Sequence, residues 1–152
     1  TAEAGAAGLK AARAIGMLTY RNYATFQAKQ TDPDPEKIDG FKASSYIKYQ
    51  GQKLVKRFNA YSYWLLTKAM DSHHLARGRG GNLIAVLQSV QQPTLIIGIS
   101  SDILCPIDEQ QFMATYMPNA ALEVIHSTYG HDGFIIETQQ ITNLLKPFMH
   151  QG

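Results

Sequence analysis

The sequence predicts an α/β fold in which an all-helical segment, residues 1–77, precedes a βα segment, residues 78–152. Three observations predict it. Apolar residues recur at helical spacing through the first half, two short runs in the second half have strand character, and a glycine-rich stretch at 77–81 separates the two patterns. With 152 residues, 45% of them hydrophobic, the chain has enough apolar material for a globular core.

The first segment is predicted to contain three helices. Apolar residues at spacings of three and four predict an amphipathic helix from residue 9 to residue 27. Two prolines in 31–36 predict an exposed loop, because each proline disfavours helix at the residue before it. The aromatic-rich region 41–70 predicts two further helices with a break near Asn59.

The second segment is predicted to contain two βα units. The expected elements are a helix at 83–90, a strand at 94–99, a helix at 107–116, a turn at Pro118-Asn119, a strand at 121–125, a loop through Gly130 and a helix at 134–149. The strand at 94–99 is continuous in apolar, β-branched residues, a pattern typical of parallel strands covered on both faces.

Two strands are too few for a stable doubly wound sheet, so we expect further strands upstream. The chain also begins without methionine, in small residues that lead directly into helical periodicity. We therefore expect it to be part of a larger protein.

Composition excludes several function classes. A net charge of +2, from 14 basic and 12 acidic residues scattered along the chain, does not form the basic face that nucleic acid requires. No apolar run approaches the roughly 20 residues of a membrane span, and no secretion signal is visible. The single cysteine, Cys105, cannot form an intramolecular disulfide, and we interpret it as a packed small side chain. We predict a cytoplasmic protein without a metal site.

Two polar residues follow the two predicted strands. Asp102 comes three residues after the first strand, and His131 follows the second strand between glycines at 130 and 133. Both therefore belong at the carboxyl edge of the sheet, where open α/β folds bind their ligands. Taken alone, Asp102 could cap the next helix and His131 could be a solvated loop residue.

As a pair, Asp102 and His131 have the order and placement of the last two members of an α/β-hydrolase Ser-His-Asp triad. In such a triad the histidine moves the proton of a serine hydroxyl, and the aspartate fixes the imidazole tautomer. No Gly-x-Ser-x-Gly nucleophile elbow occurs in the 152 residues. Because the serine precedes the aspartate in this fold, we expect it upstream.

Three blocks of sequence extend beyond this pair and cover nearly the whole chain. They are residues 8–21, residues 49–60 with Tyr63 and 66–71, and Ser101-Asp102 with 129–134. Together they resemble the homoserine O-acetyltransferase family. The resemblance implies that the chain is the C-terminal portion of an α/β-hydrolase fold preceded by an all-helical lid insertion.

The resemblance also implies a reaction. The complete enzyme would transfer an acetyl group from acetyl-CoA to L-homoserine through an acyl-serine, without a bound cofactor, for methionine biosynthesis, and would form a homodimer through the lid. Asp102 and His131 would be the triad acid and base, while Arg13, Tyr20 and Asp132 would bind homoserine. Arg13 and Tyr20 lie about two helical turns apart on one face, and a guanidinium suits a substrate carboxylate.

Other interpretations remain open at this point. Arg13 could be a solvated helix arginine, Tyr20 a core aromatic residue, and Asp132 a turn former. The acyl donor could be succinyl-CoA, the acceptor could be serine, or the chain could be a non-catalytic fragment.

Overall fold

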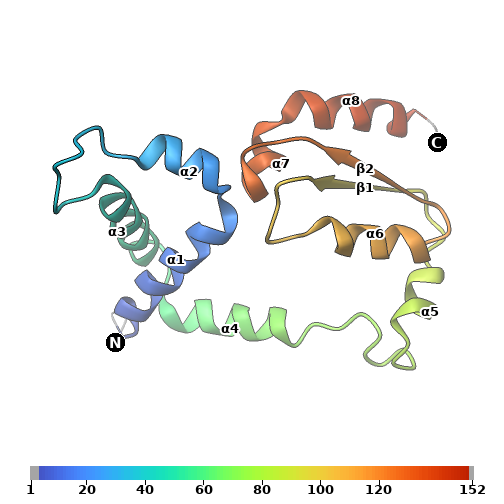
Figure 1. Ribbon diagram of the computed structural model, residues 1–152. Helices are drawn as coiled ribbons and strands as arrows, with labels where there is room; N and C mark the ends of the chain where they lie inside the picture. The colour runs from blue at the N-terminus through green and yellow to red at the C-terminus, as the bar shows by residue number, and fades with distance from the viewer. Residues whose placement is uncertain (1–3, 151–152) are drawn as a thin grey trace. The chain divides into compact units, whose positions relative to one another are not determined.

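A computed structural model describes residues 4–150 (Figure 1). Residues 1–3, with which the predicted helical segment begins, and residues 151–152 lie outside the described part. The chain divides into two compact units. Unit 1 comprises the residues up to Thr19 together with Tyr23–His73, and unit 2 comprises Tyr20–Asn22 and the residues from His74 onward.

The helices of unit 1 form where the periodicity predicted them, with one correction. They are α1 (Ala6–Tyr20), α2 (Tyr23–Gln30), α3 (Lys42–Val55) and α4 (Ala60–Asp71). The prediction of one helix over 9–27 is wrong, because the chain leaves the helix at Arg21 and starts a new one at Tyr23. The break near Asn59 is confirmed: its side chain accepts a hydrogen bond of 2.7 Å from the Ser62 amide and caps α4.

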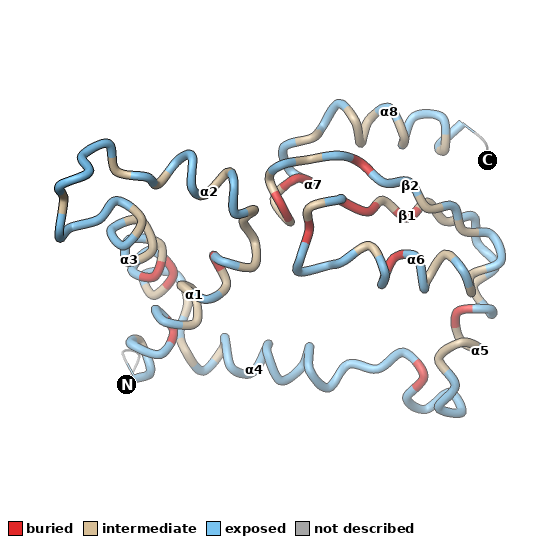
Figure 2. The backbone as a smooth tube through the Cα atoms, viewed as in Figure 1, coloured by how far each residue is buried: buried red, intermediate tan, exposed pale blue. Residues whose placement is uncertain are grey.

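Unit 1 has a small core. Leu9 and Met17 of α1 and Leu54 of α3 are buried. α1 and α3 approach closely at Gly51, where a β-carbon would lie 3.1 Å from the Lys10 carbonyl oxygen. In contrast, α4 contains no buried residue and is mostly pale blue in Figure 2.

The loop predicted at 31–36 is organised around Asp32. Its carboxylate accepts hydrogen bonds from the Lys37 ammonium and, at 2.9 Å, from the Lys42 amide at the start of α3. These two bonds, first the one from Lys37 and then the one from Lys42, hold the pKa of Asp32 below its ordinary value.

Unit 2 contains the predicted parallel sheet. Its elements are α5 (Leu83–Gln88), β1 (Thr94–Ile99), α6 (Ile107–Tyr116), β2 (Ala120–Ile125), the 3₁₀ helix η1 (Gly130–Asp132), α7 (Gly133–Ile136) and α8 (Thr138–Met149). β1 and β2 pair in parallel from Thr94 opposite Ala120 to Ile99 opposite Ile125. Both strands therefore end at the same edge.

Helices cover both faces of this sheet, and in Figure 1 α6 and α8 flank it on opposite sides. Gly98 faces α6, since a β-carbon there would lie 2.5 Å from the Ile107 Cδ1 atom. The next strand residue, Ile99, points to the other face. There its Cγ2 atom would lie 3.2 Å from a β-carbon on Gly133, the first residue of α7. Buried Leu87, Ile96, Ile99 and Ile125 form the core of this unit.

The end of the chain differs from the prediction of one helix over 134–149. The helix is interrupted at Glu137, whose backbone leaves the helical region at φ −81° and ψ 45°. Two β-branched residues, Ile135 and Ile136, precede the interruption and lower the helix propensity there. Within residues 4–150, no helix combines the length and the apolar character that crossing a membrane requires.

Candidate functional site

The candidate site lies at the carboxyl edge of the parallel strands in unit 2. The Ser100 amide donates a hydrogen bond of 3.1 Å to the Ile125 carbonyl oxygen, so the backbone segments that follow β1 and β2 leave the sheet side by side. Asp102 lies three residues beyond β1, and His131 lies six residues beyond β2. The parallel register thus brings together two residues that are distant in sequence.

Asp102 is buried, and its two carboxylate oxygens have different partners. Oδ1 accepts hydrogen bonds from the amides of Leu104 at 2.8 Å and Cys105 at 2.9 Å. Oδ2 lies 2.8 Å from the His131 Nδ1 atom. Asp102 does not cap the next helix, since the N-cap of α6 is Pro106. Its hydrogen bonds to the turn instead hold the carboxylate in the orientation that meets His131.

His131 lies in the short helix η1, and its side chain is 22% exposed against 4% for Asp102. The backbone before it is fixed, because the Gly130 amide donates a hydrogen bond of 3.1 Å to the Ser101 hydroxyl. Aromatic rings contact the imidazole edge to face: the centroid of Tyr20 lies at 5.2 Å and that of Phe134 at 5.3 Å.

The segment Tyr20–Asn22 belongs to the same compact unit and lies against the turn that carries His131. Gly130 has φ +63°, and a β-carbon there would lie 3.0 Å from both the Tyr20 carbonyl oxygen and the Asn22 amide nitrogen. Glycine is therefore favoured at this position for two reasons: its positive φ, and the close approach of the Tyr20 and Asn22 backbone.

An ion pair strengthens the same contact. The Arg21 Nε atom lies 3.1 Å from the Asp132 Oδ2 atom, and both side chains are less than a third exposed. No role was predicted for Arg21 from the sequence. The weak sequence signal for a helix break at Arg21 was the next residue, Asn22, because asparagine is favoured at the position that begins a helix.

Arg13, the remaining predicted binding residue, lies on α1 in unit 1, where it is partly exposed. Its assignment to a substrate carboxylate stays a prediction. Tyr20 and Asp132 lie with the acid–base pair in unit 2, and their predicted contacts with homoserine also stay predictions.

Cys105 is exposed, so the interpretation as a packed side chain is wrong. Because the Asp102 carboxylate accepts a hydrogen bond from the Cys105 amide, the turn directs Cys105 back toward the candidate site. Partial desolvation and then the negative charge of Asp102 raise the pKa of the Cys105 thiol, which leaves it mainly protonated at neutral pH. Asp102, Cys105 and His131 present ligand atoms that all lie within 4.8 Å of one another.

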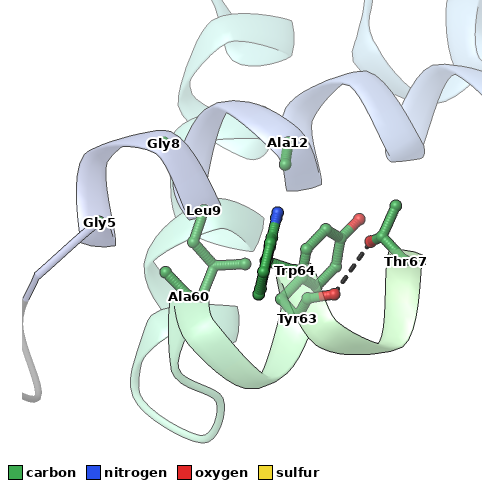
Figure 3. Close-up of a pocket in the computed structure, with 8 residues that line it drawn as sticks. All are labelled: Gly5, Gly8, Leu9, Ala12, Ala60, Tyr63, Trp64 and Thr67. Carbon is green, nitrogen blue, oxygen red and sulfur yellow. Dashed lines mark hydrogen bonds between the residues drawn. The ribbon is translucent and has the colours of Figure 1, made fainter. Parts of the chain in front are cut away.

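A separate hollow of about 330 Å³ lies in unit 1 between the start of α1 and the face of α4 (Figure 3). It is lined by Gly5, Gly8, Leu9, Ala12, Ala60, Tyr63, Trp64 and Thr67. The Thr67 hydroxyl donates to the Tyr63 carbonyl oxygen at 2.9 Å. The lining carries no charged group and therefore offers apolar contact without acid–base chemistry.

The arrangement in unit 2 is suited to proton transfer. When Nδ1–H donates to the Asp102 carboxylate, the Nε2 atom of His131 is left as the base, and the carboxylate stabilises the imidazolium that forms. The described residues supply this acid–base pair, while the 152-residue sequence contains no nucleophile elbow.

Two curated proteins similar to this chain carry the same name. The chain is 49% identical over 146 residues to a homoserine O-acetyltransferase of Cyclobacterium marinum, covering 96% of the chain and 41% of that protein. A second, from Chloroherpeton thalassium, is 44% identical over 95% of the chain and 38% of its own length. No protein-family model matches the chain.

Solved structures confirm the fold. A homoserine O-acetyltransferase from Bacillus anthracis superimposes with a TM-score of 0.81 at 18% identity, over 93% of this chain and 40% of that one. Esterase E22 gives a TM-score of 0.80 at 18% identity, over 96% of this chain and 43% of that one. The predicted α/β-hydrolase fold and the predicted resemblance are both confirmed. The chain spans about 40% of the length of the relatives that it matches.

Proposed function

Because this chain is a homologue of part of the homoserine O-acetyltransferases, we propose that it supplies the acid–base pair and substrate contacts of such an enzyme. The observation that carries the proposal is the 2.8 Å contact between His131 Nδ1 and Asp102 Oδ2 at the carboxyl edge of two parallel strands. A serine on a polypeptide segment outside these 152 residues would complete the site.

The proposed reaction has two halves. His131 first takes the proton of the serine hydroxyl, the serine oxygen attacks the thioester carbonyl of acetyl-CoA, and His131 returns the proton to the departing CoA sulfur. His131 then takes the hydroxyl proton of L-homoserine, whose oxygen attacks the acyl-serine carbonyl. The proton returns to the serine oxygen, and O-acetyl-L-homoserine leaves.

The proposed acceptor contacts rest on charge. Arg13 would bind the homoserine carboxylate, Asp132 would bind its ammonium group, and Tyr20 would line the same site. Arg21 already neutralises part of the Asp132 charge. A substrate ammonium would therefore share the Asp132 carboxylate with Arg21. The Arg21 side chain would hold that carboxylate in the orientation that receives the ammonium.

The helical lid, predicted at residues 1–77 and lying mostly in unit 1, would exclude the water that would otherwise hydrolyse the acyl-enzyme. The exposed Trp64 and Tyr61 on α4 support a homodimer contact through this lid. We propose methionine biosynthesis in the cytoplasm as the setting of the reaction.

A chimera tests the proposal. The matching segment of the Cyclobacterium marinum relative would be replaced by this chain, so that the relative supplies the serine. We expect O-acetylhomoserine from acetyl-CoA and L-homoserine, measured by mass spectrometry, and no product from the 152-residue chain alone. A folded chimera that makes no O-acetylhomoserine would overturn the proposal, and so would turnover by the chain alone.

The same chimera separates the alternatives. Supplied with succinyl-CoA, or with serine in place of homoserine, it should form far less product than with acetyl-CoA and homoserine. Because esterase E22 shares the fold, simple ester hydrolysis is measured in parallel. Hydrolysis that outpaces acetyl transfer in the presence of saturating homoserine would contradict an acyltransferase.

A further inference from the structure

Asp102, Cys105 and His131 offer three chemically different ligand atoms in one small volume. A carboxylate oxygen, a thiol sulfur and a ring nitrogen all lie within 4.8 Å of one another. Proton transfer uses the carboxylate and the imidazole and leaves the thiol without a role. From this cluster we infer a binding site for a thiophilic divalent cation of the Zn²⁺ class, which, when filled, switches off the acid–base pair.

The distances are close to those that such an ion needs. Bonds of about 2.0–2.3 Å in a tetrahedral site place neighbouring ligand atoms roughly 3.3–3.8 Å apart. Atoms up to 4.8 Å apart must therefore close by at most about 1–1.5 Å. The His131 Nδ1 and Asp102 Oδ2 atoms, 2.8 Å apart, must instead open by about 0.5–1 Å to admit the ion. The exposed Cys105 side chain can make most of this movement, while the Tyr20 and Phe134 rings that contact His131 keep the imidazole near its position.

The ligand types select the ion. A thiolate with an imidazole and one carboxylate favours Zn²⁺ or Cd²⁺, whereas Mg²⁺ and Ca²⁺ prefer sites composed of oxygen ligands. On coordination the Cys105 thiol releases its proton to solvent, and water occupies the remaining position on the exposed side.

The surroundings hold the first ligand in place. The Asp102 Oδ1 atom is fixed by the amides of Leu104 and Cys105, so the carboxylate is positioned before any ion arrives. Such second-layer hydrogen bonds commonly raise metal affinity by about 10- to 100-fold.

The consequence for activity rests on the proposed function. An ion bound between Asp102 and His131 replaces the Nδ1–Oδ2 hydrogen bond that orients the imidazole. The imidazole then no longer exchanges protons with serine or homoserine. Binding of the ion itself requires no catalytic activity and is tested separately.

The binding test uses Cd²⁺ on the folded chimera and its variants, followed by the ultraviolet charge-transfer absorption of the Cd–thiolate bond. We expect saturation at equimolar Cd²⁺ and a loss of affinity of at least about tenfold in each of Asp102→Asn, Cys105→Ser and His131→Gln. The exposed tandem histidines provide the control, so His73→Ala should bind as the unsubstituted chimera does.

Two outcomes overturn the site. One is Cd²⁺ affinity that survives Asp102→Asn and His131→Gln, because Cys105 would then bind as an isolated thiol. The other is unchanged affinity in concentrated urea, because the site would then not depend on the fold.

A second measurement tests the switch in the active chimera. We expect Zn²⁺ to inhibit acetyl transfer, a chelator to restore it, and Cys105→Ser to lose the inhibition relative to its own metal-free rate. Cd²⁺ binding without inhibition would overturn the switch but leave the proposed acyl transfer intact. An inactive chimera that still binds Cd²⁺ would instead contradict the acyl transfer alone.

Discussion

The Arg21 Nε atom lies 3.1 Å from the Asp132 Oδ2 atom, which ties the segment Tyr20–Asn22 of unit 2 to the turn that carries His131. The Tyr20 ring lies against the His131 imidazole in the same contact. The orientation of the candidate base therefore depends on residues more than a hundred positions earlier in the chain.

A double-mutant cycle on Arg21→Ala and Asp132→Asn should give a coupling energy of about 0.2–1 kcal/mol, because both side chains are partly solvated. Amide hydrogen exchange in β1 and β2 reports the stability of unit 2. The coupling should shrink in high salt. Additive effects of the two substitutions at low salt would show that the pair contributes nothing.

Gly130→Ala should destabilise unit 2 by about 2–4 kcal/mol, because it combines an unfavourable positive φ with overpacking against the Tyr20 and Asn22 backbone. Gly78→Ala is the matched control, with φ +72° and no atom within 4 Å of the added β-carbon. It should cost about 1–2 kcal/mol, the backbone contribution alone. Equal losses in the two variants, measured by hydrogen exchange, would refute the close approach at Gly130.

Asp32 should make the stability of unit 1 depend on pH. Because its folded pKa lies below the ordinary value of 3.8, the ionised carboxylate stabilises the folded unit above that pH. The stabilisation is lost as the pH falls through the lower folded pKa. Fluorescence of Trp64, the single tryptophan and a residue of α4, reports unfolding of this unit.

The matched variant is Asp32→Asn, which has no carboxylate to titrate. The unsubstituted chain should be the more stable of the two near neutral pH, and the difference should vanish in strong acid. A stability difference that is independent of pH would show that the Lys37 and Lys42 contacts do not involve charge.

The site was predictable from sequence where a short-range pattern determines position. Asp102 and His131 each follow a strand, and parallel strands end at one edge, so the strand pattern was sufficient to bring them together. Arg21 was not predictable in this way. The apolar periodicity continues past Arg21 to residue 27, whereas the helix ends at Tyr20. The segment that follows lies against Gly130, a partner that no local sequence pattern indicates.

Cys105 was misjudged for a related reason. Its residue type suggested burial, because free cysteines are usually packed small side chains. Hydrogen bonds from the Leu104 and Cys105 amides to Asp102 instead set the direction of the turn. The roles of Arg13, Tyr20 and Asp132 toward homoserine remain predictions from the resemblance, since they depend on a bound substrate.

The most direct test of the central claim is the rate of O-acetylhomoserine formation by the chimera when Asp102 is replaced by Asn. An amide cannot stabilise the His131 imidazolium and favours the wrong tautomer. The rate should therefore fall by about 10³- to 10⁴-fold, the loss typical of a triad carboxylate changed to an amide. Asp108→Asn, on the exposed first turn of α6, should retain the rate of the unsubstituted chimera. A folded Asp102→Asn chimera that also retains it would contradict the assignment of Asp102 and His131 as the acid–base pair.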